Sequence, residues 1–149
     1  MKKSLKSLEK EELYSLLIEL SSLNKENADF LRLKLDNNSE GALNHYKQKL
    51  ERIFWNDKIN LFEARKTISD FKIITKNPEH QLELMIFYVE IGVKLGEQYG
   101  DMYEAFYSSM ESMFEKVIKY LNNNPAFIPQ FLERLNSIIE RSCEGWAHK

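Results

Sequence analysis

The sequence predicts an all-α protein of about seven helices, arranged as antiparallel hairpins in a multi-helix bundle or a short α-superhelix. Apolar residues recur at helical spacing along most of the 149-residue chain, whereas no long segment alternates with the period of two that is typical of a strand. Asn, Ser and Pro stand where helix starts are expected. Gly and Pro number only 5 and 3, and they fall mainly at the edges of the predicted helices.

A chain of this length is expected to form one domain. We expect an N-terminal helical hairpin, residues 5–35, to pack on a main bundle of residues 40–142, with an irregular tail at 143–149. The first helix of the hairpin covers Glu9 to Ser22. Its apolar face follows the spacing i, i+3, i+4, i+7 and consists of Leu13, Leu16, Leu17 and Leu20. Asn24 or Asn27 can cap a second, short helix, whose apolar residues are Phe30, Leu31 and Leu35.

The next two helices are also introduced by capping residues. Ser39 can cap a third helix, whose inner face carries Leu43, Tyr46, Leu50 and Ile53. Asn60, with Glu63 three residues later, is a plausible capping box for a fourth helix that ends near Thr75.

The clearest start signal is Asn77-Pro78, because Pro at the first helical position loses no hydrogen bond. The fifth helix that begins there is expected to stop at Gly100. Asp101 is expected to cap the sixth helix, and the last helix starts between Pro125 and Pro129. Along the sixth helix, steps of three and four residues form a stripe expected to be buried in a multi-helix core, namely Tyr103, Phe106, Met110, Met113, Val117 and Tyr120.

Acidic residues follow a second pattern on the fifth and sixth helices. If these helices pack antiparallel, two acidic ridges can face one groove, a candidate interaction surface for a basic partner made of Glu83, Glu90, Glu97, Glu104, Glu111 and Glu115. The plainer interpretation is a pair of solvated faces. An intermediate one is a structural ion pair in which Arg65 of the basic fourth helix binds Glu90 or Glu111.

Charge is distributed unevenly along the chain, although the net charge is only −2. Residues 1–77 contain 15 Lys/Arg and 12 Asp/Glu, whereas residues 78–121 contain 3 and 8. The overall balance argues against a dedicated nonspecific nucleic-acid binder, which is usually basic.

The sequence shows no catalytic motif, no phosphate-binding loop and no cofactor signature. The three histidines are far apart and the required ligand set for a metal is absent, so we expect no metal site. A single cysteine, Cys143, suits a reducing compartment, and no apolar stretch is long enough to span a membrane, so we expect a cytoplasmic protein.

Three segments resemble a family of small bacterial proteins known only as a domain of unknown function. They are FEARKTISDFK at 62–72, YVEIGVKLGEQYGD at 88–101 and FYSSMESMFEKV at 106–117. The leucine-rich opening at 7–31 resembles the same family. The resemblance implies an all-helical cytoplasmic protein and supplies no activity or cofactor.

These observations favour a noncatalytic protein-interaction or scaffold protein that binds another protein or itself. The alternative is a nucleic-acid-associated accessory protein that uses the basic N-terminal half.

The stripe on the sixth helix generates a stability prediction. If Phe106 and Met110 are core residues, Phe106→Ala should lower the free energy of unfolding by about 3–5 kcal/mol and Met110→Ala by about 2–5 kcal/mol. Urea denaturation measures both. Variants that unfold like the parent chain would place these side chains on the surface.

Overall fold

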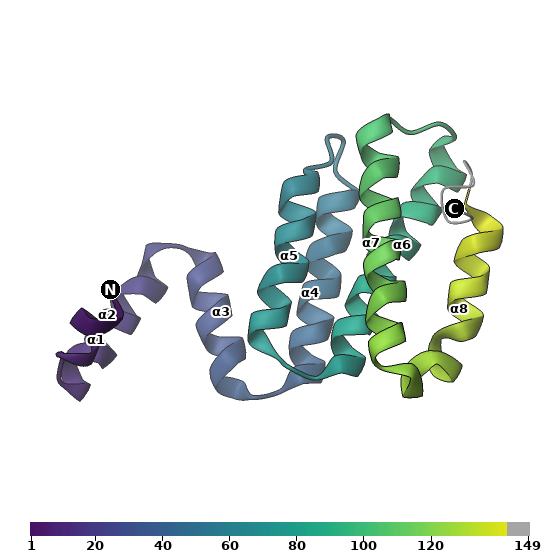
Figure 1. The fold of residues 1–149 in the computed structure, drawn as a ribbon. Helices are drawn as coiled ribbons and strands as arrows, with labels where there is room; N and C mark the ends of the chain where they lie inside the picture. The colour runs from purple at the N-terminus through teal and green to yellow at the C-terminus, as the bar shows by residue number, and fades with distance from the viewer. Residues whose placement is uncertain (143–149) are drawn as a thin grey trace. The chain divides into compact units, whose positions relative to one another are not determined.

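The structure is a computed structural model that describes residues 1–142 (Figure 1). Of the described part, 85% is helical, in eight α-helices without a strand, which confirms the predicted all-α class. The described chain clusters into two compact units, residues 1–38 and the part from residue 39 onward. The division falls between the expected hairpin and the expected bundle. The packing of the hairpin on the bundle stays a prediction.

The first unit contains α1 (Lys2–Lys6), α2 (Lys10–Leu23) and α3 (Lys25–Asp36). The five-residue helix α1 was not anticipated from the sequence. Glu9 caps α2 through a reciprocal box with Glu12, and Asn24 caps α3 by accepting a hydrogen bond from the Asn27 amide at 2.8 Å. The helix α3 ends at Asn37, whose φ of 53° is one that Asn tolerates better than most residues.

The second unit is a five-helix bundle. Successive helices run antiparallel to one another in Figure 1. They are α4 (Ser39–Phe54), α5 (Leu61–Ile74), α6 (Pro78–Tyr99), α7 (Glu104–Asn123) and α8 (Ile128–Arg141), the last entered through a short 3₁₀ turn at Pro125–Phe127. The bounds agree with the predicted helices to within a few residues.

The helix α6 is the centre of this bundle, since it packs against α4, α5, α7 and α8. Its start is the one that the sequence predicts: the side chain of Asn77 accepts a hydrogen bond from the His80 amide at 3.2 Å, and Pro78 is the first helical residue. Gly100 is the C-cap residue that follows the helix, and its φ of 76° favours glycine. The helix carries apolar side chains around most of its circumference, and most of them are buried, as expected for a core helix.

An aromatic cluster joins α4, α6 and α7. The ring of Phe54 meets the rings of Tyr88 and Phe106 edge-on, with centroid distances of 5.0 and 6.5 Å. The hydroxyl of Tyr88 is buried and hydrogen-bonds the hydroxyl of Ser109 at 2.5 Å, so this polar atom is not left unsatisfied in the core.

The predicted stripe on α7 is buried in its middle and open at its ends. The buried members are Phe106, Met110, Met113 and Val117. Tyr120 is half-buried and donates a hydrogen bond to Gln81 at 2.8 Å. Tyr103 is 47% exposed and occupies the N-cap position, so assigning it to the core was wrong.

The expected cap at Asp101 was also wrong, because α7 begins at Glu104, later than predicted. Tyr103 has no side-chain hydrogen bond that caps the helix. Instead, the hydroxyl of Tyr107 accepts a hydrogen bond from the Met102 amide at 2.9 Å. A side chain from within the helix therefore satisfies a backbone donor in the preceding loop.

Helices α6 and α7 approach closely at Gly92, which Met110 covers. A Cβ atom built on Gly92 would overlap the Met110 sulfur and lie 2.9 Å from its Cγ and Cε. Met110 is completely buried, so its side chain has little room to move aside. The absence of a side chain at position 92 thus sets how near the two helices lie.

We expect Gly92→Ala to lower the free energy of unfolding by about 1–2 kcal/mol. Overpacking costs about 1–3 kcal/mol, and the better helix propensity of Ala returns up to about 1 kcal/mol. In a Met110→Ala background the same change should be neutral or stabilising, because the obstructing atoms are gone. Chemical denaturation of the single and double variants measures this coupling. Equal effects in both backgrounds would contradict the close-contact interpretation.

Candidate interaction sites

The acidic ridge of α6 is bound by arginines of α8. Arg134 binds Glu83 with both ends of its guanidinium, Nη1 to Oε1 at 2.6 Å and Nη2 to Oε2 at 2.7 Å. It also binds Glu90, with Nη2 2.6 Å from Oε1 and Nε 3.1 Å from Oε2. Seven residues further along each helix, Arg141 binds Glu97. Its Nη2 lies 2.5 Å from Oε1 and its Nε lies 3.0 Å from Oε2. The matching seven-residue spacing shows that α6 and α8 run parallel.

This arrangement corrects the expected groove between α6 and α7. Tyr88 and Gly92 of α6 face α7, as their contacts with Ser109 and Met110 show. At 100° per residue, Glu90 lies about half a turn from both, and Glu83 and Glu97 lie near Glu90. The ridge of α6 therefore does not share a groove with the acidic residues of α7.

The acidic residues of α7 stay as separate candidates. Glu104 and Glu115 are exposed, and Glu111 is half-buried. Glu104 lies beside Arg65 in a shallow depression that also includes Ser108 and Ser112.

The expected partner of Glu90 was wrong, because Arg134 takes the place of Arg65. Neighbouring order along the chain favoured Arg65 of α5, but α8 returns to the bundle and places Arg134 on the outer face of α6. Arg65 lies near the buried hydroxyl of Tyr88 instead. Burial raises the pKa of Tyr88, and the Ser109 hydrogen bond and the charge of Arg65 only partly oppose this. The alternative pairing of Arg65 with Glu111 stays a prediction.

The carboxylate of Glu83 has its pKa held below its ordinary value. Burial by itself would raise this pKa, but the hydrogen bonds and charges of Arg134 and Lys47 outweigh burial. Lys47 Nζ lies 3.2 Å from the Glu83 carboxylate. Burial would lower the pKa of Arg134, yet its hydrogen bonds with Glu90 and Glu83 raise it. The hydrogen bond from Arg141 likewise lowers the pKa of Glu97.

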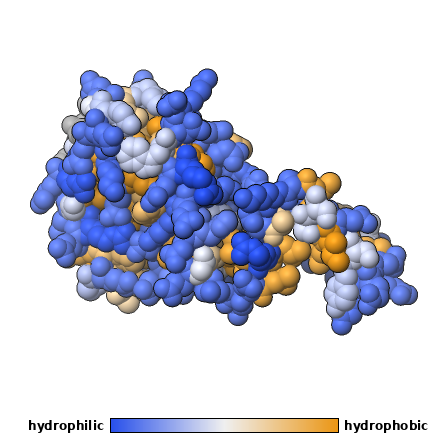
Figure 2. All heavy atoms as spheres, turned by 180° about the vertical axis from the view of Figure 1, so that it is seen from behind, coloured by the Kyte–Doolittle hydropathy of each residue, from blue (hydrophilic) through white to orange (hydrophobic). Residues whose placement is uncertain are grey.

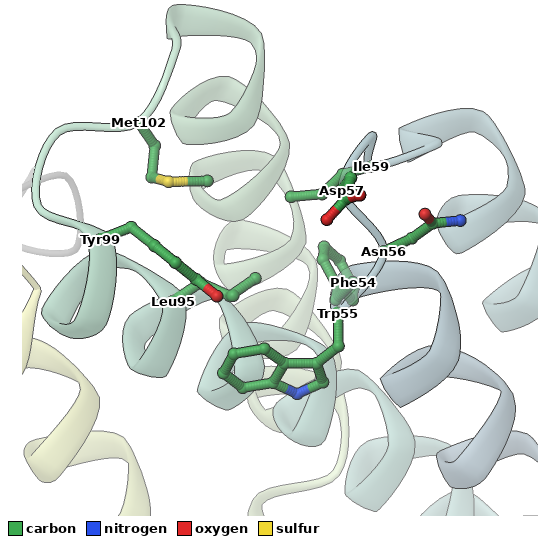
Figure 3. A pocket seen from close by; sticks show the side chains of 8 residues that line it. All are labelled: Phe54, Trp55, Asn56, Asp57, Ile59, Leu95, Tyr99 and Met102. Carbon is green, nitrogen blue, oxygen red and sulfur yellow. The ribbon is translucent and has the colours of Figure 1, made fainter.

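A small pocket, here called the end pocket, opens where α4 and α6 end (Figure 3). Its volume is about 220 Å³. The lining residues are Phe54, Trp55, Asn56, Asp57, Ile59, Leu95, Tyr99 and Met102. The rings of Trp55 and Tyr99 lie 6.4 Å apart at 56° to each other. In Figure 3 the Asp57 carboxylate points toward the middle of the pocket, whereas the Asn56 amide points away.

The first unit has an exposed apolar face. On α2, Tyr14, Leu17 and Ile18 lie within one turn of each other and are 47%, 46% and 63% exposed. We call these three residues the α2 stripe. Leu23 and Leu35 are more exposed still, at 72% and 74%. Figure 2 shows hydrophobic side chains at the surface of this unit.

No group of three or more His, Cys, Asp or Glu side chains in residues 1–142 is placed to hold a metal ion. His80 is used within the bundle, where its Nδ1 lies 2.6 Å from the Ser39 hydroxyl. Cys143 and His148 lie outside the described residues. Within the described part, no helix has the length and apolarity needed to cross a bilayer.

The fold and these sites define a small all-helical protein with an ion-paired face, a small aromatic pocket and an exposed apolar hairpin. The chain belongs to the family of unknown function DUF6155, whose model matches residues 1–149. Neither the curated proteins nor the solved structures contain a match to this chain.

The ion pairs generate a prediction with an internal control. Arg134→Met should lower the free energy of unfolding at neutral pH by about 1–3 kcal/mol, between the ranges for exposed and buried pairs, because Glu83 and Glu90 lose a half-buried partner. Arg141→Met removes a more exposed pair and should cost less than about 1 kcal/mol. Denaturant titrations of both variants test the difference. Equal losses would show that burial does not govern the strength of these pairs.

The pH dependence has a definite sign. The unfolded chain takes up a proton on Glu83 near the ordinary pKa of 4.5, whereas the folded chain does so at lower pH. The stabilising contribution is therefore complete above that ordinary value and is lost as the pH falls through the lowered pKa. The stability difference between the parent chain and Arg134→Met should shrink below about pH 4.5. A difference that grows on acidification would contradict this assignment.

Proposed function

We propose that this protein is a noncatalytic interaction protein whose N-terminal hairpin docks on the hairpin of a second copy. The single observation that carries the proposal is the apolar face of residues 1–38. Within this range, Leu33 is the buried apolar residue, while the α2 stripe, Leu23 and Leu35 are all at least 45% exposed.

A unit this small cannot build a sufficient core by itself. Chains below about 40 residues usually need a disulfide, a metal or an oligomeric partner. Residues 1–38 contain no cysteine. The apolar side chains cover more than half of the circumference of α2, and α3 alone can cover only one side of it. An additional helical surface is therefore the expected partner.

A second hairpin fits this face in chemistry and in size. Residues 1–38 contain seven Lys/Arg and seven Asp/Glu, so two copies do not repel each other. A two-fold axis would bring the same stripe together from both chains, which is the commonest form of self-association. Two antiparallel hairpins then form a four-helix bundle. The α2 stripe, Leu23 and Leu35 are exposed and available for such an interface, to which each partner in a standard complex contributes ~800 Å².

The alternative role in nucleic-acid binding depends on the basic first half of the chain. Its excess positive charge lies in residues 39–77, with eight Lys/Arg and five Asp/Glu, and not in the balanced hairpin. Such a role would appear as binding to DNA or RNA that falls steeply with salt. Self-association through apolar side chains would instead depend little on salt.

We expect the parent chain to be a dimer at micromolar concentration and Ile18→Lys to be a monomer, because Lys places a charge in the apolar interface. Sedimentation velocity across a concentration series measures both. Ile18 is mostly exposed, so the change should leave the helical content unaltered, which circular dichroism checks.

The matched control is Ile73→Lys, which changes an isoleucine of α5 that is 51% exposed in the bundle. This variant should dimerise like the parent chain. A parent chain that is monomeric at all concentrations would contradict the proposal and favour docking of the hairpin on its own bundle. A dimer that persists in Ile18→Lys and is lost in Ile73→Lys would place the interface on the bundle.

A further inference from the structure

We propose that the end pocket binds a small organic cation that carries a methylated ammonium group. This inference concerns the bundle alone and does not depend on the hairpin. The pocket combines the two features that such a group requires, aromatic ring faces and a carboxylate.

The aromatic wall is built from two helix ends. Trp55 directly follows α4, and Tyr99 is the last residue of α6. The two residues are 42% and 61% exposed, and their ring centroids lie 6.4 Å apart with an interplanar angle of 56°. An ammonium group within about 6 Å of a ring centroid is attracted to the ring face, most strongly to Trp. Two rings spaced and inclined in this way can contact one methylated head group together.

The back of the pocket is rigid and apolar. Phe54 is 1% exposed and is held edge-on against Tyr88 and Phe106, so it cannot rotate away. Leu95 is buried as well. In Figure 3, the Met102 thioether and the Ile59 side chain point toward the pocket from the two loops. These groups suit methyl groups better than the strongly hydrated ammonium of an unmodified lysine.

The charge of the pocket favours a cation. Among the described residues that line it, Asp57 is the charged one, and its carboxylate points inward (Figure 3). Lys94 and Arg141 line a separate depression, in which Trp55 also takes part. The carbonyl ends of α4 and α6 add partial negative charge, which the starts of α5 and α7 at the same end of the bundle partly offset. Asp57 and the two rings therefore carry the selectivity.

The volume limits the ligand to one head group. A space of about 220 Å³ is below the 300–1,000 Å³ that is usual for drug-sized ligands. A trimethylammonium group with a short chain is the appropriate size. The same group occurs in small solutes and on trimethylated lysine side chains, and the experiment separates these two sources.

The probes are choline and its uncharged isostere 3,3-dimethylbutan-1-ol, titrated into the full chain. The signal of the Trp55 indole N–H in a proton–nitrogen correlation spectrum reports binding, and the Trp55→Leu variant assigns it. Choline should shift this signal saturably and bind about tenfold or more tightly than the isostere, since the shapes match and only the charge differs. No saturable shift, or equal binding of both probes, would overturn the proposal.

Two carboxylate variants make the test specific. Asp57→Asn should weaken choline binding about fivefold or more, whereas Asp101→Asn should change it less than about twofold. Both replace an exposed aspartate near the same end of the bundle and alter the net charge equally. Equal weakening by the two variants would mean that choline is attracted by the overall negative charge of this surface and not by a specific site, which would overturn the proposal. Unchanged melting temperatures of both variants show that the bundle is intact.

A peptide with one trimethyllysine forms the last arm of the experiment. Tighter binding of choline than of the peptide identifies a free solute as the ligand. Tighter binding of the peptide identifies a methylated protein tail. Either order supports the methylated ammonium as the recognised group, and binding of neither probe rejects it.

Discussion

The bundle depends on the burial of α6 around most of its circumference. A helix that is apolar around nearly its whole circumference has no stable place at a surface, so four other helices must surround it. The partners of α6 differ in kind around its circumference. Toward α4 and α7 it presents an aromatic ring and a glycine, and toward α8 it presents carboxylates. The same helix thus sets the helix separation in the core and determines where the charged surface lies.

The starts of α3, α5 and α6 could be predicted from the sequence because local signals determine them. Asn24, Asn60 and Asn77 all cap the helices that they precede, and the hydrogen bonds to the third following residue are present in each case. At the start of α7, where the prediction was wrong, the side chain that serves the loop comes from within the helix, five residues after the amide that it binds. Asp101 was a reasonable cap by composition, but the hydroxyl of Tyr107 serves the preceding loop and α7 starts later.

The ion pairs show what a single sequence lacks. The seven-residue spacing of Glu83, Glu90 and Glu97 was visible, and so was the spacing of Arg134 and Arg141. No local sequence pattern indicates that α8 returns parallel to α6, because that direction follows from how the helices pack in space. The exposed rings around Asp57 are a similar case: Trp55 and Tyr99 are 44 residues apart and meet only because α4 and α6 end at the same level. Matching heptad spacings of opposite charge were the signal that could have revealed the first arrangement.

The contact between Gly92 and Met110 has an evolutionary consequence. Because the methionine fills the space that a side chain at position 92 would need, the two positions cannot change independently. Across the family, we expect a larger residue at position 92 to accompany a shorter one at position 110, and a glycine to accompany a long, unbranched side chain. The two positions should therefore co-vary in an alignment of relatives. They are eighteen residues apart, and two side chains at that separation in one continuous helix would be too distant to touch.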